Sequence, residues 1–148
     1  MLRIQRCQSS EQAGWLPLRQ ALWPHASEQE HRDEIGQQLS EPQRYINFVA
    51  YDSRQQPVGL AEASLRRDYV NGTDNSPVVF LEGIYVVPEQ RRQGVAAQLI
   101  EFVAQWGREQ GCVQMASDTA LDNLVSQETH TALGFEETER VVFFKRQL

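Results

Sequence analysis

Apolar residues alternate with polar ones, or gather in short runs, in six segments of the chain. Both patterns predict β-strands. The strands are predicted at residues 2–7, 45–51, 58–65, 78–87, 112–116 and 140–144. The second and third are separated by a polar turn, so they are expected to form a hairpin, and Pro88 ends the fourth.

Four other segments carry apolar residues at helical spacing. The helices are predicted at residues 11–23, 27–39, 95–110 and 122–133. Local signals mark their ends: Ser27 and Glu30 form a capping box, and Pro24 stops the first helix. Gly111 and Gly134 follow the last two helices, where glycine commonly ends a helix.

This order of elements predicts an α/β protein with a central mixed sheet flanked by helices. The chain of 148 residues has no linker or low-complexity tract, so we expect a single domain, residues 1–148. No membrane-length apolar run or signal peptide is visible. Cys7 and Cys112 lie far apart, which favours reduced thiols over a metal site. We therefore expect a cytoplasmic protein with no metal and no membrane partner.

Acidic residues outnumber basic residues by 20 to 14, which gives a net charge of -6. Binding to nucleic acid needs a basic face, so this balance argues against it. An acidic chain suits a cationic substrate, but acidity also serves the solubility of many cytosolic proteins.

Residues 86–96 join a predicted strand to a predicted helix and have the chemistry of an anion site. Gly94 lets the backbone approach a ligand, and Ala96 keeps the first helical turn small. N–H groups at a helix start attract anions, and Arg91 and Arg92 can add charge-assisted hydrogen bonds to a diphosphate. The segment is neither a Walker loop nor a GxGxxG dinucleotide motif.

The run Arg91-x-x-Gly94-x-Ala96 resembles the coenzyme A signature, R/Q-x-x-G-x-G/A, of the GNAT N-acetyltransferases. Ala132-Leu133-Gly134-Phe135 resembles the family's second signature, a helix that ends in Gly-Phe. The resemblance covers essentially the whole chain. It implies the GNAT fold with a splayed pair of strands, and acetyl-CoA as co-substrate without a metal.

The resemblance also implies where coenzyme A lies. Pantetheine would run between strands 83–87 and 113–116 and pair with backbone groups near Ile84 to Val86 like an added strand. The pyrophosphate would rest on backbone amides before the following helix. The implied cofactor-binding residues are Ile84, Tyr85, Val86, Arg91, Arg92, Gln93, Gly94, Val95, Ala96 and Asn123.

Several longer segments are similar to one branch of the family, the aminoglycoside 6′-N-acetyltransferases. They are residues 22–24, 68–72, 76–84, 115–119 and 134–140. This similarity implies a polyamine-sugar antibiotic as the acceptor, and a homodimer.

Glu82 stands in the middle of an apolar strand. A carboxylate there is costly unless it is hydrogen-bonded or faces an opening. By simple alternation it shares a face with Phe80 and Ile84, although a bulge would change that register. We predict that Glu82 accepts the proton of the acceptor ammonium. A solvent-facing or structurally bonded glutamate is the alternative.

Four further residues are candidates for binding the acceptor. Asp118 follows a strand at its carboxyl end, where α/β sheets bind ligands, and could share the proton path or instead cap the next helix. Trp23 and Tyr69 could form walls against sugar rings, although Trp23 could also be a core anchor. The resemblance singles out Glu139 for distant amines, while the acidic run 136–139 is also typical of a solvated face.

The leaving thiolate needs a proton, and here the sequence departs from the family. Many GNAT members carry a tyrosine in the helix before Gly-Phe, whereas this chain has Gln127-Glu128-Thr129-His130-Thr131. His130 is a candidate acid on chemical grounds. A helix-surface histidine and departure of the thiolate without an acid are the alternatives.

Two other functions fit the same patterns. An N-acetyltransferase for another amine, such as a polyamine, an amino acid or a protein N-terminus, would change only the acceptor site. A sensor or structural dimer would bind coenzyme A without turnover. Thiol release with tobramycin, spermidine and peptides separates these functions.

Overall fold

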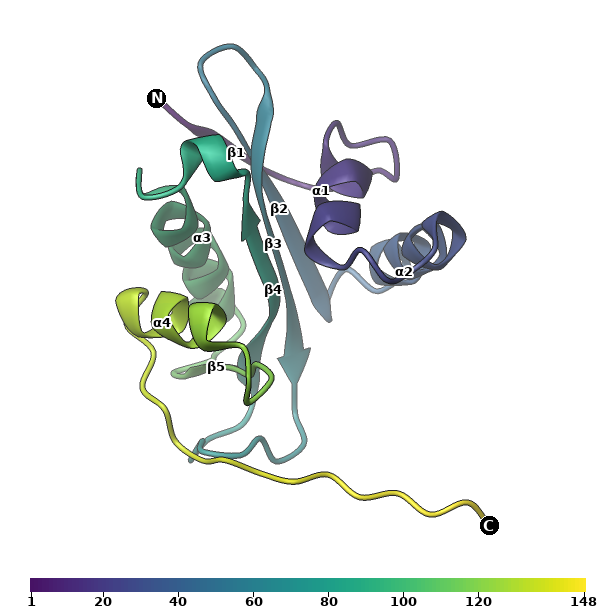
Figure 1. Ribbon diagram of the computed structural model, residues 1–148, viewed down its shortest axis with the longest axis vertical. Helices are drawn as coiled ribbons and strands as arrows, with labels where there is room; N and C mark the ends of the chain where they lie inside the picture. The colour runs from purple at the N-terminus through teal and green to yellow at the C-terminus, as the bar shows by residue number, and fades with distance from the viewer.

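A five-stranded sheet with helices on both faces forms the centre of the molecule, as the computed structural model of residues 1–148 shows (Figure 1). The strands are β1 (Arg3–Arg6), β2 (Tyr45–Tyr51), β3 (Pro57–Arg66), β4 (Val78–Val86) and β5 (Met115–Ser117). The helices are α1 (Trp15–Leu22), α2 (Glu28–Ser40), α3 (Val95–Glu109) and α4 (Leu124–Ala132), with a 3-10 turn, η1 (Pro88–Gln90). The strands lie in sequence order; all neighbours are antiparallel except β4 and β5. The sheet is therefore mixed, as predicted.

The two faces of the sheet are covered by different helices (Figure 1). On one face, Leu99, Val103 and Trp106 of α3 pack into the larger apolar core. On the other face, Trp15 and Leu18 of α1 pack into a second core with α2. Each such side chain contributes about 1.5–3 kcal/mol when fully buried.

The helix ends follow local chemistry. The hydroxyl of Ser27 accepts the backbone N–H of Glu30 at 3.1 Å, so Ser27 caps α2 as predicted, although the Glu30 side chain does not return the second hydrogen bond of a capping box. Helix α1 starts at Trp15, later than the predicted residue 11. The reason is Gly14, whose φ of 85° is left-handed and cannot continue a right-handed helix.

Glu82 is the extra residue of a β-bulge. On β3, Glu62 pairs with Gly83 and Ala63 pairs with Leu81, so Glu82 has no residue opposite it. The bulge reverses the alternation of side-chain faces beyond it. As a result, Ile84 packs against the core formed with α3. The face that simple alternation predicts for Ile84 is therefore wrong.

Strands β4 and β5 run together for only a short distance. Their last register pair is Leu81 with Ser117. Beyond this pair, residues 83–86 of β4 have a strand on one side only, namely β3. This is the splayed pair that the GNAT resemblance implies.

The predicted final strand, residues 140–144, is not formed. Residues 135–148 are irregular, and in Figure 1 they run from α4 past the end of the sheet to a distant C terminus. Val142, Phe143 and Phe144 are 77%, 86% and 92% exposed. A strand needs a neighbour that pairs with its backbone groups, and this chain provides none there. None of the helices is both long and apolar enough to cross a bilayer.

Candidate active site

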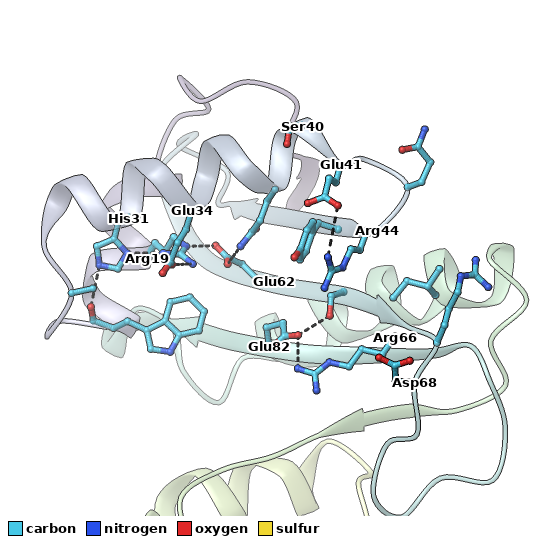
Figure 2. Close-up of a pocket in the computed structure, with 18 of the residues that line it drawn as sticks. Arg19, His31, Glu34, Ser40, Glu41, Arg44, Glu62, Arg66, Asp68 and Glu82 are labelled. Atoms are coloured by element: carbon cyan, nitrogen blue, oxygen red, sulfur yellow. Dashed lines mark hydrogen bonds and ion pairs between the residues drawn. The ribbon is translucent and has the colours of Figure 1, made fainter. Parts of the chain in front are cut away.

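A cleft of about 1300 Å³ lies between α2 and the adjoining face of β3 and β4 (Figure 2). Three residues of the predicted acceptor site line it: Trp23, Tyr69 and Glu82. Figure 2 shows its charged residues in three groups: one around Arg19, one around Glu82, and the pair of Arg44 with Glu41. Most of the cleft wall is polar, which suits an acceptor with many amines and hydroxyls.

The carboxylate of Glu82 is held through one oxygen. The hydroxyl of Ser64 donates to Oε1 at 2.6 Å, and Nη2 of Arg66 donates to the same oxygen at 2.9 Å. Both contacts use Oε1, so Oε2 is left without a protein partner. The side chain is 34% exposed. Glu82 therefore faces an opening and is structurally bonded at the same time.

Trp23 forms a wall of the cleft beside Glu82. A Cβ at Gly83 would lie 2.6 Å from Cζ2 of Trp23, so the indole rests directly on β4. Trp23 is half-buried and lines the cleft, so it packs at the end of α1 and also presents a surface to the cleft. Tyr69 lines another part of the cleft and is 77% exposed.

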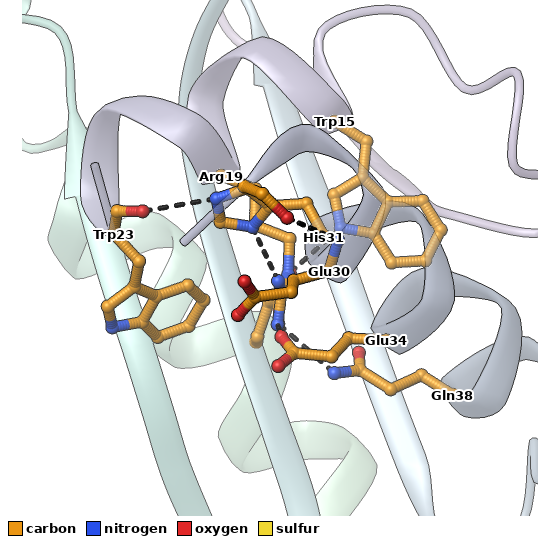
Figure 3. Close-up of polar contacts among 9 residues, drawn as sticks. Trp15, Arg19, Trp23, Glu30, His31, Glu34 and Gln38 are labelled. Carbon is orange, nitrogen blue, oxygen red and sulfur yellow. Dashed lines mark hydrogen bonds and ion pairs between the residues drawn. The ribbon is translucent and has the colours of Figure 1, made fainter. Parts of the chain in front are cut away.

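A buried polar network supports Trp23 (Figure 3). Arg19 donates through Nε to Oε2 of Glu62 at 2.9 Å, and both side chains are nearly inaccessible. Trp15 donates to the same oxygen at 2.8 Å. Nη1 of Arg19 lies 2.7 Å from Nδ1 of His31. Arginine can only donate, so this nitrogen of His31 accepts.

This tautomer of His31 fixes the backbone of Trp23. Its Nε2 carries the proton and donates to the carbonyl of Trp23 at 3.1 Å. The guanidinium of Arg19 lies 4.7 Å from the centroid of the same indole, a cation–π distance. The network therefore holds Trp23 through both its backbone and its ring.

Asp118 lies at the tip of β5, close in register to Glu82. It follows Ser117, whose register partner Leu81 immediately precedes Glu82. Asp118 is exposed and is not part of the cleft wall. It does not cap the next helix, because the side chain of Asn123 accepts the backbone N–H that opens α4. Asn123, which the resemblance assigns to coenzyme A, thus has a structural task.

His130 is bonded at both ring nitrogens. Nδ1 lies 2.7 Å from the carbonyl of Ser126, and Nε2 lies 2.8 Å from the hydroxyl of Ser117. The ring also contacts the edge of Phe135, with centroids 5.3 Å apart. His130 is therefore not a free surface histidine: it ties α4 to the end of β5.

The loop before α3 presents a row of free donors. The backbone N–H groups of residues 92–96 donate no hydrogen bond within the chain. Gly94 has a φ of 81°, and a Cβ there would meet nothing within 4 Å, so the loop is open. The positive end of the α3 dipole adds to these donors. These groups fit the pyrophosphate that the sequence predicts here.

Arg91 lies differently from the sequence-based expectation. Its Nε donates to the carbonyl of Val86 at 2.8 Å, and its guanidinium lies 5.6 Å from the centroid of the Tyr85 ring. The side chain thus folds back on the end of β4. Arg92 is exposed and has a positive φ of 63°.

Glu139 lies in the irregular C-terminal segment and does not line the cleft of its own chain. Its neighbour Thr138 contacts Gly72, in the loop that carries Tyr69. Next to it, a hydrogen bond from Arg140 lowers the pKa of the exposed Glu137.

Several supporting residues escaped the sequence analysis: Ser64 and Arg66 on β3, and Arg19, His31 and Glu62 in the buried network. The sequence does carry a signal for those on β3. Glu62, Ser64 and Arg66 alternate with apolar residues along β3. Such a polar face on a central strand indicates a cleft or a bonded network.

An extended ligand with a phosphate end fits the open edge of β4 and the loop before α3, and an amine fits the adjoining cleft. These are the features of a coenzyme A-dependent acyltransferase. Residues 12–135 match the Acetyltransferase (GNAT) family, and the chain belongs to this family.

The relatives and solved structures point to one branch. The chain is 47% identical to an aminoglycoside N(6′)-acetyltransferase type 1 of Acinetobacter genomosp. 13, with 99% of each chain covered. It is 49% identical to that of Serratia marcescens, over 96% of this chain and 97% of the relative. AAC(6′)-Iy, in complex with the bisubstrate analogue CoA-S-monomethyl-acetylneamine, matches with a TM-score of 0.93 and 44% identity, over 100% of this chain and 99% of the other. AAC(6′)-Ih from Acinetobacter baumannii matches with a TM-score of 0.94 and 44% identity over the same shares.

Proposed function

We propose that this protein transfers the acetyl group of acetyl-CoA to the 6′-amine of aminoglycoside antibiotics. The observation that carries the proposal concerns Glu82, which lies in a polar cleft next to the open edge of β4. One of its carboxylate oxygens is hydrogen-bonded to the protein and the other is free. The nearly full-length similarity to aminoglycoside N(6′)-acetyltransferases supports the choice of acceptor. Acetylation removes a positive charge from the antibiotic, which would make the protein a resistance enzyme.

The cofactor site uses backbone groups more than side chains. Alternate backbone groups of residues 84–86 point away from β3 and can pair with an extended pantetheine. The N–H groups of residues 92–96 would hold the pyrophosphate, and Arg92 lies within the same loop. Acetyl-CoA supplies the thioester, an acyl group with a good leaving group.

The chemical step requires a neutral amine. Glu82 accepts the proton of the bound ammonium, directly or through one water, at the oxygen that the protein leaves free. The amine nitrogen then attacks the acetyl carbonyl, so that a C–N bond forms as the C–S bond breaks. The nitrogen loses its remaining extra proton as the amide forms, and the thiolate takes up a proton from it or from water. A backbone N–H from residues 84–86 stabilises the charge on the carbonyl oxygen. Asp118, one residue beyond the end of the ladder, helps to bind the amine.

The thiolate leaves without direct help from His130 in this scheme. Both ring nitrogens of His130 are hydrogen-bonded within the chain, so acid catalysis by this residue would require one of these contacts to break. Of the alternatives open from sequence, departure of the thiolate without a histidine acid fits these contacts best.

The acceptor is held by aromatic walls and carboxylates. Trp23 and Tyr69 offer flat surfaces to the sugar rings. Arginines of the chain neutralise several acids of the cleft: Arg19 pairs with Glu34, and Arg66 pairs with Glu82. No cation of the chain pairs with Asp68, which also lines the cleft. Asp68 is therefore available to an ammonium group of the acceptor.

A homodimer is the second part of the proposal. The C-terminal segment 140–148 exposes Val142, Phe143 and Phe144 almost completely, far from its own core (Figure 1). Apolar exposure of this size is typical of an interaction surface. We assign the segment to a second copy of the chain, where Glu139 would reach the partner's acceptor.

Light scattering tests the dimer. The parent protein should have twice the 17.0 kDa mass of one chain. The variant Phe143→Asp/Phe144→Asp should be monomeric, with an unchanged α/β circular dichroism spectrum. A monomeric parent would remove the dimer from the account.

Location in the cytoplasm completes the proposal. Cys7 and Cys112 are both free and buried, which is compatible with a reducing compartment. Acetyl-CoA is also made and used inside the cell.

The test of function is a panel assay of thiol release with acetyl-CoA and either tobramycin, spermidine or a peptide. We expect release with tobramycin, a product heavier by one acetyl group, and an NMR shift at the 6′-position. Preferred turnover of spermidine or peptide would move the protein to another acceptor class. Binding of coenzyme A without any release would make it a sensor.

A further inference from the structure

The guanidinium of Arg66 is fixed from two directions, although the side chain is 43% exposed. Its Cζ lies 3.6 Å from the centroid of the Phe80 ring, and Phe80 is only 4% exposed. Its Nη2 donates to Oε1 of Glu82 at 2.9 Å (Figure 2). Cation–π stacking on a buried ring and a charge-assisted hydrogen bond together restrict the group. Arg66 is thus not an ordinary surface arginine.

Glu82 needs such a restraint because of the bulge. A bulged residue has no cross-strand neighbour to limit its side chain, and a carboxylate on it has several rotamers of similar energy. Ser64 and Arg66 stand two residues apart on the same face of β3, and both bond to Oε1. One oxygen of Glu82 is anchored twice, and the other is left free.

We propose that Arg66 is a positioning residue for the acetyl-transfer reaction: it orients Glu82 so that Oε2 meets the acceptor amine. This inference rests on the proposed role of Glu82 as the base. Arg66 need not touch the acceptor or acetyl-CoA. It acts by keeping Glu82 in one rotamer.

A positioning role predicts a distinct kinetic pattern. Arg66→Gln should lower kcat with tobramycin by about 10- to 100-fold, the usual effect of a misplaced catalytic group. The KM for acetyl-CoA should stay unchanged, because the loop before α3 is remote from Arg66. Arg66→Lys should recover part of kcat, since lysine keeps the charge but lacks the planar fork that stacks on Phe80.

The matched control is Arg32→Gln. Arg32 also forms an exposed ion pair, with Glu28 at 3.1 Å, but it lies on α2 outside the cleft. It should keep the parent kcat. Thermal unfolding of the Arg66 variants, compared with this control, separates loss of fold from loss of positioning.

A double-mutant cycle with Glu82→Gln decides the proposal. If Arg66 acts through Glu82, Arg66→Gln should change kcat by less than about threefold in the Glu82→Gln background. An equal loss in both backgrounds would show that Arg66 acts elsewhere. A parent-like kcat for Arg66→Gln alone would also overturn the positioning role of Arg66. A slow Glu82→Gln enzyme would in that case still support Glu82 as the base. If Glu82→Gln itself keeps the parent rate, the base assignment fails, and the role of Arg66 fails with it.

Discussion

The indole of Trp23 rests on Gly83, at a point where even a methyl group would come within 2.6 Å of Cζ2. The glycine therefore sets how close the aromatic wall lies to Glu82, the preceding residue of β4. This contact joins the end of α1 to the strand that carries the proposed base. The width of the acceptor cleft depends on it.

Gly83→Ala should push Trp23 away from β4. We expect a higher KM for the aminoglycoside, an unchanged KM for acetyl-CoA, and a loss of about 1–3 kcal/mol of unfolding free energy from overpacking. Steady-state kinetics and urea unfolding measure these effects. Equal changes in both KM values would indicate a general distortion of the sheet.

Arg19→Met should be strongly destabilising. It leaves the carboxylate of Glu62, 1% exposed, without its cation, and breaking a buried pair in this way costs about 3–5 kcal/mol. In the double variant Arg19→Met/Glu62→Gln the uncompensated charge is gone, so stability should partly recover. Urea unfolding of the two variants measures the difference, and a double variant less stable than Arg19→Met would contradict this explanation.

Asp68→Asn should raise the KM for tobramycin severalfold and leave kcat almost unchanged. The residue offers an unpaired charge to the acceptor and takes no part in proton transfer. Because ionic attraction is screened by salt, the parent KM should also rise between low and high ionic strength. The KM of Asp68→Asn should rise less steeply, and identical salt dependence would remove Asp68 from acceptor binding.

The two cysteines should not disturb a thiol-release assay. Burial raises the pKa of both Cys7 and Cys112, so at pH 7.5 the reactive thiolate fraction is smaller than for a free thiol. A disulfide-based thiol reagent should therefore label the folded protein slowly and label 2 cysteines after denaturation. Because pH 7.5 lies below both raised pKa values, the rate in the folded state should rise steadily with pH, by about tenfold per unit while the pH stays below them. Rapid labelling of folded protein at pH 7.5 would contradict the burial of these thiols.

Much of this architecture follows from local sequence signals. The Ser27 N-cap and the open loop at Gly94 depend on a few adjacent residues, so they could be predicted. The bulge at Glu82 could not, because it depends on how β3 and β4 align. The anchoring of Glu82 by Arg66 depends on that same register. The sequence singled out Glu82 as a candidate base, and the structure places it on the cleft wall, but its partners Ser64 and Arg66 could not be predicted.

For the C-terminal segment, the sequence predicts a strand that the structure does not contain. Residues 140–144 have the apolar pattern of a strand, but a pattern states only what a segment can do if a neighbour is present. Within one chain there is no neighbour, and the segment stays extended and exposed. The network of Arg19 and His31 escaped prediction for a related reason: charged residues on a helix are usually at the surface.

The most direct test of the account is the Glu82→Gln variant, examined for turnover and for acetyl-CoA binding on the same preparation. Glutamine fills the same space and can still bond to Ser64, but it cannot accept a proton from the ammonium. We expect kcat with tobramycin to fall by about 10²- to 10⁴-fold, the usual contribution of a general base. Calorimetry should give the parent affinity for acetyl-CoA. A variant that turns over tobramycin at the parent rate would contradict the central claim.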